Sequence, residues 1–186
     1  MKKKIMVIVL FAIISGICAG FIIETNKKYG SVSITEYNVN EIVENGEYSV
    51  TVDGYEIFEE EEFAQEYNIT QSTDLLELTD GRADNVYVMV VDVTFDITGD
   101  MKGFPYADIN VTTGAVCQGI SSEYITLINE DNAIKEIEKG SKKEIKIPFL
   151  IHSISFPYTV TKDSLKDMTW DIYFSVTPAR YVRLGE

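Results

Sequence analysis

The sequence predicts an all-β protein: an antiparallel β-sandwich preceded by one N-terminal transmembrane or signal helix. Three observations support this prediction. After residue 23, apolar and polar residues alternate in several segments of strand length, and turn residues separate these segments. Long helical periodicity, internal repeats and heptads are missing from this part of the sequence. Such a series of strands is typical of two antiparallel sheets packed face to face.

The N-terminus has the order of charges that is typical of exported proteins. Lys2, Lys3 and Lys4 precede an uncharged run from Ile5 to Ile23. As a helix, the 19 residues of this run would span close to the ~30 Å hydrocarbon core of a bilayer. Because lysines flanking a span stay in the cytoplasm, we expect everything after Glu24 to lie outside the cell membrane.

Three fates of this run stay open. It could be retained as a single-pass anchor, cleaved as a secretory signal after residue 18 or 20, or acylated at Cys18. The residues before Cys18 end in Ile17, a bulky side chain that departs from the pattern of bacterial lipoproteins. We therefore expect a protein of the cell membrane with its C-terminal domain outside, and a secreted protein is the alternative.

The predicted organisation is a membrane anchor or signal at residues 1–23, a tether and first strand region at 24–45, and a β-sandwich domain at 46–186. The chain after residue 23 has 13 basic and 30 acidic residues, which gives a formal charge of −17. This field disfavours nucleic acid and anionic lipid head groups as partners. Cys117 is the single cysteine of this part, so no intramolecular disulfide can form there.

The first predicted strands lie in residues 47–58, where apolar residues alternate with polar ones and Asp53-Gly54 marks a turn or bulge. The clearest strand follows at 85–97, before a turn at Gly99-Asp100. Its odd positions are apolar throughout, whereas its even positions change from valine to polar residues after Val90. One face of this strand is therefore expected to be buried along its whole length, and the other to reach water halfway along.

Two further strands are expected near the C-terminus. In residues 141–156, alternation continues through Pro148, which cannot donate a ladder hydrogen bond and so predicts an edge strand or a bulge. In residues 169–177, Trp170, Ile172, Phe174 and Val176 share the apolar face. Two segments remain ambiguous between helix and loop: one around Phe63, and one at 123–144 with partly helical apolar spacing.

Four segments in this order resemble a group of uncharacterised cell-envelope proteins of Gram-positive bacteria. They are "DGYEIFEEEEFAQEYNIT", "VYVMVVDVTFDITGD", "KKEIKIPFLI" and "DIYFSVTPARYVRL". The group looks like the telokin-like, immunoglobulin-like domains of unknown function, and the resemblance covers roughly residues 45 to 184. It implies an immunoglobulin-like antiparallel β-sandwich outside the membrane and no catalytic residues.

The sequence predicts no catalytic, cofactor-binding or metal-binding residue. His152 is the only histidine and lacks a nucleophile motif around it, so we interpret it as a partly exposed structural residue. Cys117 lacks a companion motif and is interpreted as a buried small residue. For the acidic run Glu59 to Glu62, calcium binding stays open, but a solvated loop is favoured because consecutive acids on an extended chain point to opposite faces.

The tyrosines suggest a different role. Tyr173 is expected to face away from the apolar side of its strand, and Tyr181 follows Pro178, so some aromatic rings could reach the surface and seat a sugar or a protein. The sequence thus favours a non-catalytic binding or interaction module of the cell envelope that requires no cofactor. Its expected partners are the cell membrane, through the N-terminal helix, and another envelope protein. The alternative is a secreted glycan- or calcium-binding module.

Overall fold

The structure is a computed structural model that describes residues 15–25, 27, 33–69, 85–129 and 137–185. It has two compact units, Met1–Ser33 and Ile34–Glu186. In the first unit, residues 15–25 are helical. No helix within the described ranges combines the length and the hydropathy that a membrane crossing needs. Residues 5–14 of the predicted span from Ile5 to Ile23 lie outside the described residues. The three lysines and residues 28–32 of the predicted tether lie outside them as well.

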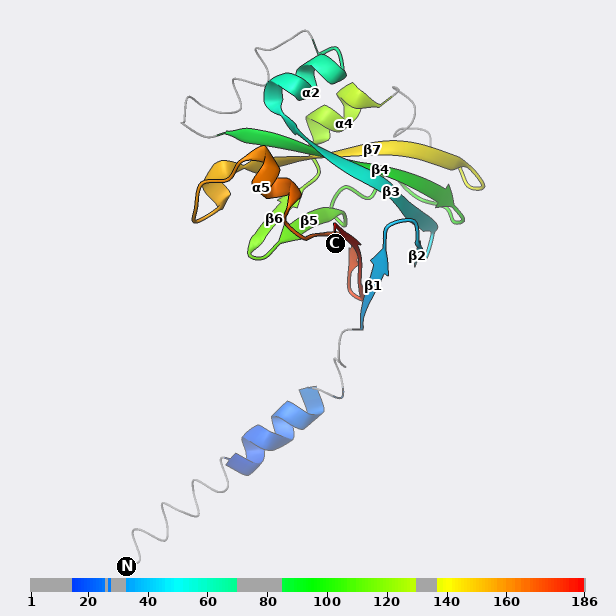
Figure 1. Ribbon diagram of the computed structural model, residues 1–186. Helices are drawn as coiled ribbons and strands as arrows, with labels where there is room; N and C mark the ends of the chain where they lie inside the picture. The colour runs from blue at the N-terminus through cyan, green and yellow to red at the C-terminus, as the bar shows by residue number, and fades with distance from the viewer. Residues whose placement is uncertain (1–14, 26, 28–32, 70–84, 130–136, 186) are drawn as a thin grey trace, which may run out of the picture. The chain divides into compact units, whose positions relative to one another are not determined.

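The second unit contains a five-stranded sheet with the order β1-β9-β8-β5-β6 (Figure 1). Its strands are β1 (Ile34–Asn38), β5 (Asn110–Thr113), β6 (Val116–Gly119), β8 (Trp170–Val176) and β9 (Ala179–Leu184). The pairs β9-β8, β8-β5 and β5-β6 are antiparallel, but β1 runs parallel to β9. The prediction of purely antiparallel sheets is therefore wrong for β1.

The other sheet has four strands in the order β2-β3-β4-β7 and is antiparallel throughout. Its strands are β2 (Ile42–Asn45), β3 (Tyr48–Glu59), β4 (Val86–Ile97) and β7 (Lys142–His152). The register between β3 and β4 shifts between Val52 and Gly54, which confirms a bulge at Asp53-Gly54. The region expected to hold the tether and first strand thus contains β1 and β2, one in each sheet.

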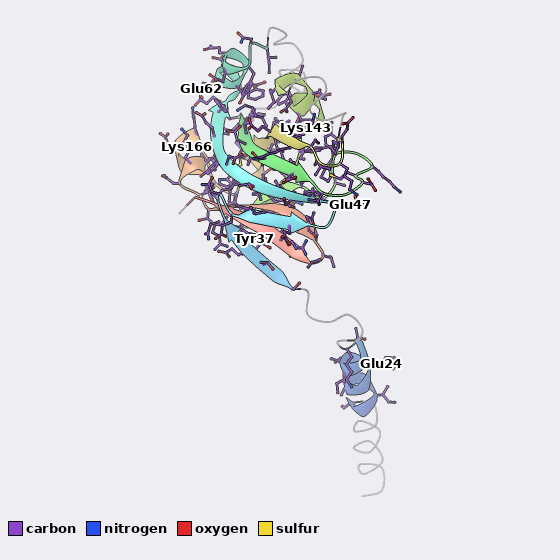
Figure 2. The ribbon with its side chains drawn as sticks, turned by 90° about the vertical axis from the view of Figure 1, so that its right-hand side faces the viewer. Glu24, Tyr37, Glu47, Glu62, Lys143 and Lys166 are labelled. Atoms are coloured by element: carbon purple, nitrogen blue, oxygen red, sulfur yellow. The ribbon has the colours of Figure 1, made fainter. Side chains whose placement is uncertain are left out.

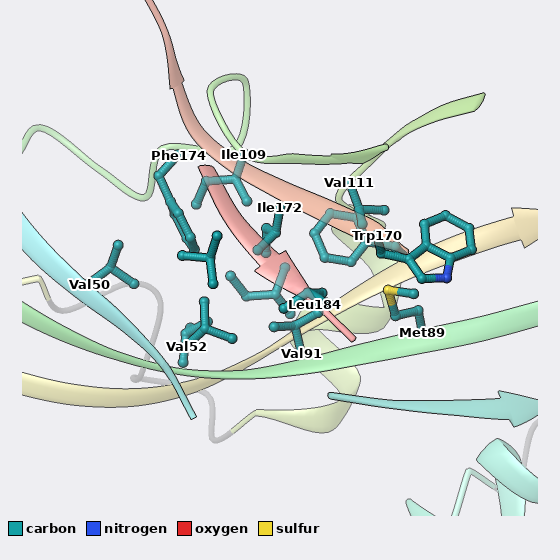
Figure 3. Packing of buried hydrophobic residues seen from close by; sticks show 14 of the residues in the cluster. Val50, Val52, Met89, Val91, Ile109, Val111, Trp170, Ile172, Phe174 and Leu184 are labelled. Carbon is teal, nitrogen blue, oxygen red and sulfur yellow. The ribbon is translucent and has the colours of Figure 1, made fainter. Parts of the chain in front are cut away.

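The two sheets pack in a sandwich-like arrangement around one hydrophobic core (Figure 3). Val50, Val52, Met89 and Val91 of the four-stranded sheet lie opposite Ile172 and other residues of the five-stranded sheet. Every odd position of β4 from Tyr87 to Ile97 is buried, as the alternation predicts. Interdigitated aliphatic and aromatic side chains thus fill the space between the sheets.

Helices cover part of the outer face of the four-stranded sheet, as Figure 1 shows. They are α2 (Glu60–Glu66) and α4 (Ser122–Ile128); the short η1 (Ser153–Ser155) and α5 (Lys162–Lys166) follow β7. Phe63 of α2 and Tyr124 of α4 bury Val88 and Val90, the even positions of β4. Both ambiguous segments therefore contain short helices, and their apolar residues explain why β4 is apolar on both faces only in its first half.

Pro148 lies in β7, which is an edge strand of its sheet, as predicted. Its carbonyl oxygen points to the outer edge, where it accepts a hydrogen bond from the Ser121 backbone N–H at 2.9 Å. Nearby, the side chain of Asn129 forms two hydrogen bonds of 2.8 Å with the backbone of Lys146. The residues before and after α4 thus satisfy backbone groups that an edge strand otherwise leaves to water.

The predicted turn at Gly99-Asp100 requires its glycine. The backbone N–H of Gly99 donates to the carbonyl oxygen of Glu47 at 2.7 Å. A Cβ atom at residue 99 would lie 2.8 Å from the Cα of Glu47. Only a residue without a side chain permits this approach between the β2-β3 hairpin and the end of β4.

Candidate functional site

The outer face of the five-stranded sheet carries two rows of polar and aromatic side chains, which we call the tyrosine face. Residues opposite each other in neighbouring strands point to the same side of a sheet, so the strand registers define these rows. The first row is Asn38, Arg183, Asp171, Thr112 and Cys117, and the second is Glu36, Tyr181, Tyr173, Asn110 and Gly119. As predicted, Tyr173 faces away from the buried Trp170, Ile172 and Phe174.

A network of hydrogen bonds and ion pairs fixes the centre of the tyrosine face. The Tyr181 hydroxyl donates to Glu36 Oε2 at 2.6 Å and accepts from Arg183 Nη2 at 3.3 Å. The Arg183 guanidinium also pairs with Glu36 Oε1 at 3.0 Å and with Asp171 Oδ1 at 3.1 Å. The rings of Tyr173 and Tyr181 lie beside each other, 5.0 Å between centroids. Strands β1, β9 and β8 are thus joined through their side chains as well as their backbones.

Tyr181 is only 8% exposed, so the expectation that it reaches the surface is wrong. Its hydrogen bond to the Glu36 carboxylate, with a smaller contribution from burial, raises the pKa of Tyr181 to about 12. The cause is electrostatic, because loss of the proton would place a phenolate against a carboxylate. The neutral tyrosine therefore stabilises the folded state fully below pH ~10, the pKa of an unfolded tyrosine, and this contribution is lost between pH 10 and 12.

Replacing Tyr181 with phenylalanine should lower the free energy of unfolding by about 1 kcal/mol near pH 8, the usual net contribution of one hydrogen bond. The difference from the wild type should shrink as the pH rises from 10 toward 12. Urea unfolding followed by circular dichroism at pH 8, 10 and 11.5 measures it. Tyr158→Phe is the matched control because Tyr158 is 57% exposed. A difference that does not change with pH would contradict the role given to the Glu36 hydrogen bond.

A second candidate site is a groove of about 610 Å³ on β3, β4 and β7, beside the end of α4. It is lined by Asp53, Asp92, Val93, Thr94, Ile128, Asn129, Glu144, Ile145 and Lys146. Lys146 Nζ donates to Asp92 Oδ1 at 2.7 Å, and this bond raises the pKa of Lys146. Thr94 donates to Asp53 Oδ2 at 2.8 Å. Since these groups already satisfy one another, the groove is less suited to charged ligands than its composition indicates.

The acidic run Glu59 to Glu62 is not the extended loop that the sequence favours, because residues 60–62 form the first turn of α2. Glutamates stabilise this end of a helix, where backbone N–H groups are unpaired. Glu62 accepts from the Glu59 backbone N–H at 3.0 Å and pairs with Lys162. Figure 2 shows Glu62 and Lys166 of α5 on the same flank. The hydrogen bond from Lys162 is the main reason that the pKa of Glu62 is lowered.

Within the described residues, no group of three or more His, Cys, Asp or Glu side chains is placed to hold a metal ion. His152 is partly exposed at the end of β7, as expected. Cys117, however, is exposed on the tyrosine face, 3.7 Å from Asn110 Oδ1, so the expectation that it is buried is wrong. Val116 takes the inward position of β6, and Cys117 therefore points outward.

The sequence alone indicates Tyr173 and Tyr181 as candidate site residues, but it does not indicate Glu36, Asp171 or Arg183. Glu36 and Tyr181 are 145 residues apart, and only the parallel pairing of β1 with β9 brings them together. No local pattern predicts that pairing. For Cys117 a signal did exist, because alternation between the inward Val111 and Val116 around the turn at Gly114 places Cys117 on the opposite face.

The fold and the site together define a class: a two-sheet, sandwich-like β domain with helices over one outer face and a polar, aromatic face on the other. A family model described as DUF5028, a domain of unknown function, matches residues 28–181. Because this match spans most of the chain, the protein belongs to the DUF5028 family. Neither a curated protein nor a solved structure matches the chain.

Proposed function

We propose that this protein is a non-catalytic binding module of the cell envelope, held on the outer side of the cell membrane by its N-terminal helix. The tyrosine face is the observation that carries the proposal. Its side chains are ordered by their own hydrogen bonds and ion pairs, so binding a partner would cost little additional side-chain entropy. Tyr and Arg are also the residue types that contribute most at protein interfaces.

The difference between the two sheets supports the same proposal. Helices α2 and α4 pack on the outer face of the four-stranded sheet, and its groove is lined by groups that pair with one another. The tyrosine face instead presents partly exposed side chains across four strands, from Glu36 in β1 to Thr112 in β5. A surface that extends over four strands suits a macromolecular partner better than a small substrate, which prefers a concave site.

Export and anchoring rest on the three N-terminal lysines and the uncharged run after them. The resemblance to Gram-positive envelope proteins and the two facing sheets support an immunoglobulin-like domain as the extracellular part. The motifs of hydrolases and phosphate-binding enzymes are absent from the sequence. On this proposal the module recognises another envelope protein and makes no covalent bond itself.

A second candidate is binding of a glycan at the same face, favoured by the partly exposed ring of Tyr173, which packs beside the buried ring of Tyr181. Their centroids lie 5.0 Å apart at an interplanar angle of 33°, and Asn110 and Asp171 flank them in the strand registers. Aromatic rings beside polar groups can hold a sugar through its apolar face and its hydroxyls. Retention of the purified protein on cell-wall glycan, lost in Tyr173→Ala, would favour this candidate over a protein partner.

Cys117 offers a direct test because it is exposed on the tyrosine face and is the single cysteine after residue 23. We would label intact Gram-positive cells expressing the full chain with a membrane-impermeant maleimide that carries a photo-crosslinker. The proposal predicts labelling without permeabilisation and a defined cross-linked protein after illumination. The matched control is Cys117→Ser with Gln65→Cys, which places the probe on the exposed side of α2.

Labelling that requires permeabilised cells would overturn the extracellular location. Equal cross-linking from residues 117 and 65 would overturn the tyrosine face as the binding surface. A hydrolase or metal-dependent activity in the purified protein, abolished by substitutions that leave the fold intact, would overturn the non-catalytic role. The intact mass of the protein in membrane and medium fractions would separate a retained anchor from a cleaved signal and from acylation at Cys18.

A further inference from the structure

Strand β1 is an edge strand of the five-stranded sheet, and its outer edge is open (Figure 1). The direction of its backbone groups follows from Asn38, whose N–H donates to Glu41 Oε2 at 2.7 Å and whose carbonyl oxygen accepts from the Glu41 N–H at 3.1 Å. Asn38 therefore directs both backbone groups away from β9. Since successive residues of a strand alternate, Ile34 and Glu36 also direct theirs outward, while Tyr37 bonds to β9.

The outward backbone groups of Ile34 and Glu36 are unpaired within the described part of the chain. The two residues thus present two N–H and two carbonyl groups in a row, at a position where Ile34 is 69% exposed. β1 also contains no lysine, proline or bulge, which are among the features that protect strand edges in proteins. This edge is therefore a template for one further strand.

The other edge strands differ from β1. The outer edge of β7 is covered by hydrogen bonds with Ser121 and Asn129. β2 and β6 have only four residues each, and the chain after β6 bridges to β7 through Ile120 and Phe149. Of the edges that the structure describes, that of β1 is therefore the one best suited to strand pairing.

We infer that the outer edge of β1 binds an extended segment of a protein partner, which adds to the five-stranded sheet as a further strand. This inference rests on the proposed function as a binding module, since it names the way in which a protein partner attaches beside the tyrosine face. An extended polypeptide matches the spacing of the two unpaired sets of backbone groups. Glu36 belongs to both surfaces, because its side chain ends a row of the tyrosine face and its backbone lies on the edge.

The side chains of β1 indicate which residues the partner segment carries. Glu36 bonds to Arg183 and Tyr181, but its side chain is 44% exposed, and a carboxylate has room for further donors. A basic residue opposite Glu36 is therefore favoured, and an acidic one is disfavoured. Ile34 lies two residues away on the same side of the strand, where it favours an aliphatic residue. The expected segment thus has a basic and an aliphatic residue separated by one position.

A second copy of the chain complements this edge less well. In a symmetric antiparallel pair of two β1 strands, Glu36 would lie opposite either Glu36 or Ile34 of the other copy, because Glu41 occupies the backbone groups of Asn38. Neither side chain complements a carboxylate, and like charges opposite each other destabilise a sheet. The formal charge of −17 after residue 23 also opposes self-association. Charge therefore favours a different protein with a basic residue in the added strand.

Titration of the isotope-labelled full chain in a neutral detergent with a synthetic peptide tests the edge. In this seven-residue peptide threonine alternates with valine, and lysine replaces the central valine. It therefore presents lysine to Glu36 and valine to Ile34 in either strand direction. We expect the NMR signals of the Ile34 and Glu36 amides to shift on binding, and that of Leu127 on α4 to stay unchanged. A peptide with a central glutamate is the matched control and should bind roughly fivefold more weakly.

Two N-methylated forms of the lysine peptide test the backbone pairing. One is methylated at its valines and its lysine, and the other at its threonines. Because these two sets direct their N–H groups to opposite sides of an extended peptide, one form should keep its affinity and the other should lose it. The form that loses affinity shows whether the added strand is antiparallel or parallel to β1. Equal affinities of the two forms would overturn strand addition.

Ile34→Pro tests the edge from the protein side. The proline ring removes an N–H that β1 does not need for its pairing with β9, and it blocks the approach of another strand. Binding of the lysine peptide should weaken about tenfold, while the control Ile34→Val should stay within roughly twofold of the wild type. Protection of the Tyr37 amide from exchange checks that β1 stays paired in Ile34→Pro. If that protection is lost, the N-methylated peptides decide.

Cross-linking from Cys117 on cells separates this inference from the proposed function. If the partner attaches through the edge, Ile34→Pro should lower the yield of cross-linked protein and Ile34→Val should not. An unchanged yield in Ile34→Pro, or no shift of the Ile34 and Glu36 amides with the lysine peptide, overturns strand addition alone. Equal cross-linking from residues 117 and 65 overturns the tyrosine face, whatever the peptide does. A dimer of the purified chain that Ile34→Pro dissociates would identify a second copy as the occupant and would also overturn this inference.

Discussion

Replacing Trp170 with alanine is expected to lower the free energy of unfolding by about 3–5 kcal/mol, the usual cost of removing a large aromatic side chain from a core. Trp170 is fully buried at the start of β8, and its indole N–H donates to the Leu165 carbonyl oxygen at 2.9 Å. Leu165 is itself fully buried in α5. The substitution therefore removes core volume and also the bond that holds α5 at the end of the sandwich.

Urea unfolding of the full chain in a mild detergent, followed by far-ultraviolet circular dichroism, measures this loss. Trp170→Phe should cost less, roughly 1–2 kcal/mol, because it keeps most of the ring but loses the hydrogen bond. Val176→Ala is the control, since an exposed site usually changes stability by no more than about 0.5 kcal/mol. If Trp170→Ala unfolds within 1 kcal/mol of the wild type, the packing described for this end of the core is wrong.

The strands that sequence reasoning predicted best are those whose burial follows simple alternation. β4 keeps one face in the core along its whole length, and β8 does so from Trp170 to Phe174, so every second residue there is apolar. Val176 was predicted on the same face of β8, but it is 59% exposed because the register shifts between Tyr173 and Ser175. Pro148 predicted an edge strand for a physical reason, because it lacks the N–H that a central strand needs. The helices were harder, since α2 and α4 have only seven residues each. Two helical turns give too few apolar positions to show a period.

The binding face was mostly beyond prediction because it depends on register. Arg183 and Asp171 come together through the β8-β9 hairpin, but Glu36 joins them only through the parallel pairing of β1. That pairing is determined by tertiary packing, including the partly buried Tyr37 against the core.

Replacing Phe63 with alanine should destabilise α2 and α4, the helices that cover the four-stranded sheet, more than it destabilises the rest of the fold. Phe63 is fully buried between Tyr67 at 4.9 Å, Tyr124 at 5.3 Å and Phe58 at 6.2 Å, measured between ring centroids. These residues form a second cluster, outside the main core. We expect a loss of about 3–4 kcal/mol in the stability of α2 and α4, with less effect on β8 and β9.

Amide hydrogen exchange by mass spectrometry measures this difference directly. Peptides from α2 and α4 should exchange faster in Phe63→Ala, while those from β8 and β9 keep their protection, whereas Trp170→Ala should accelerate exchange in both sheets. Gln65→Ala, on the exposed side of α2, is the control. Cross-linking from Cys117 should survive Phe63→Ala, since the tyrosine face lies on the other sheet. If cross-linking is lost while the amides of β8 and β9 stay protected from exchange, the partner binds through α2 and α4, and the tyrosine face is not its site.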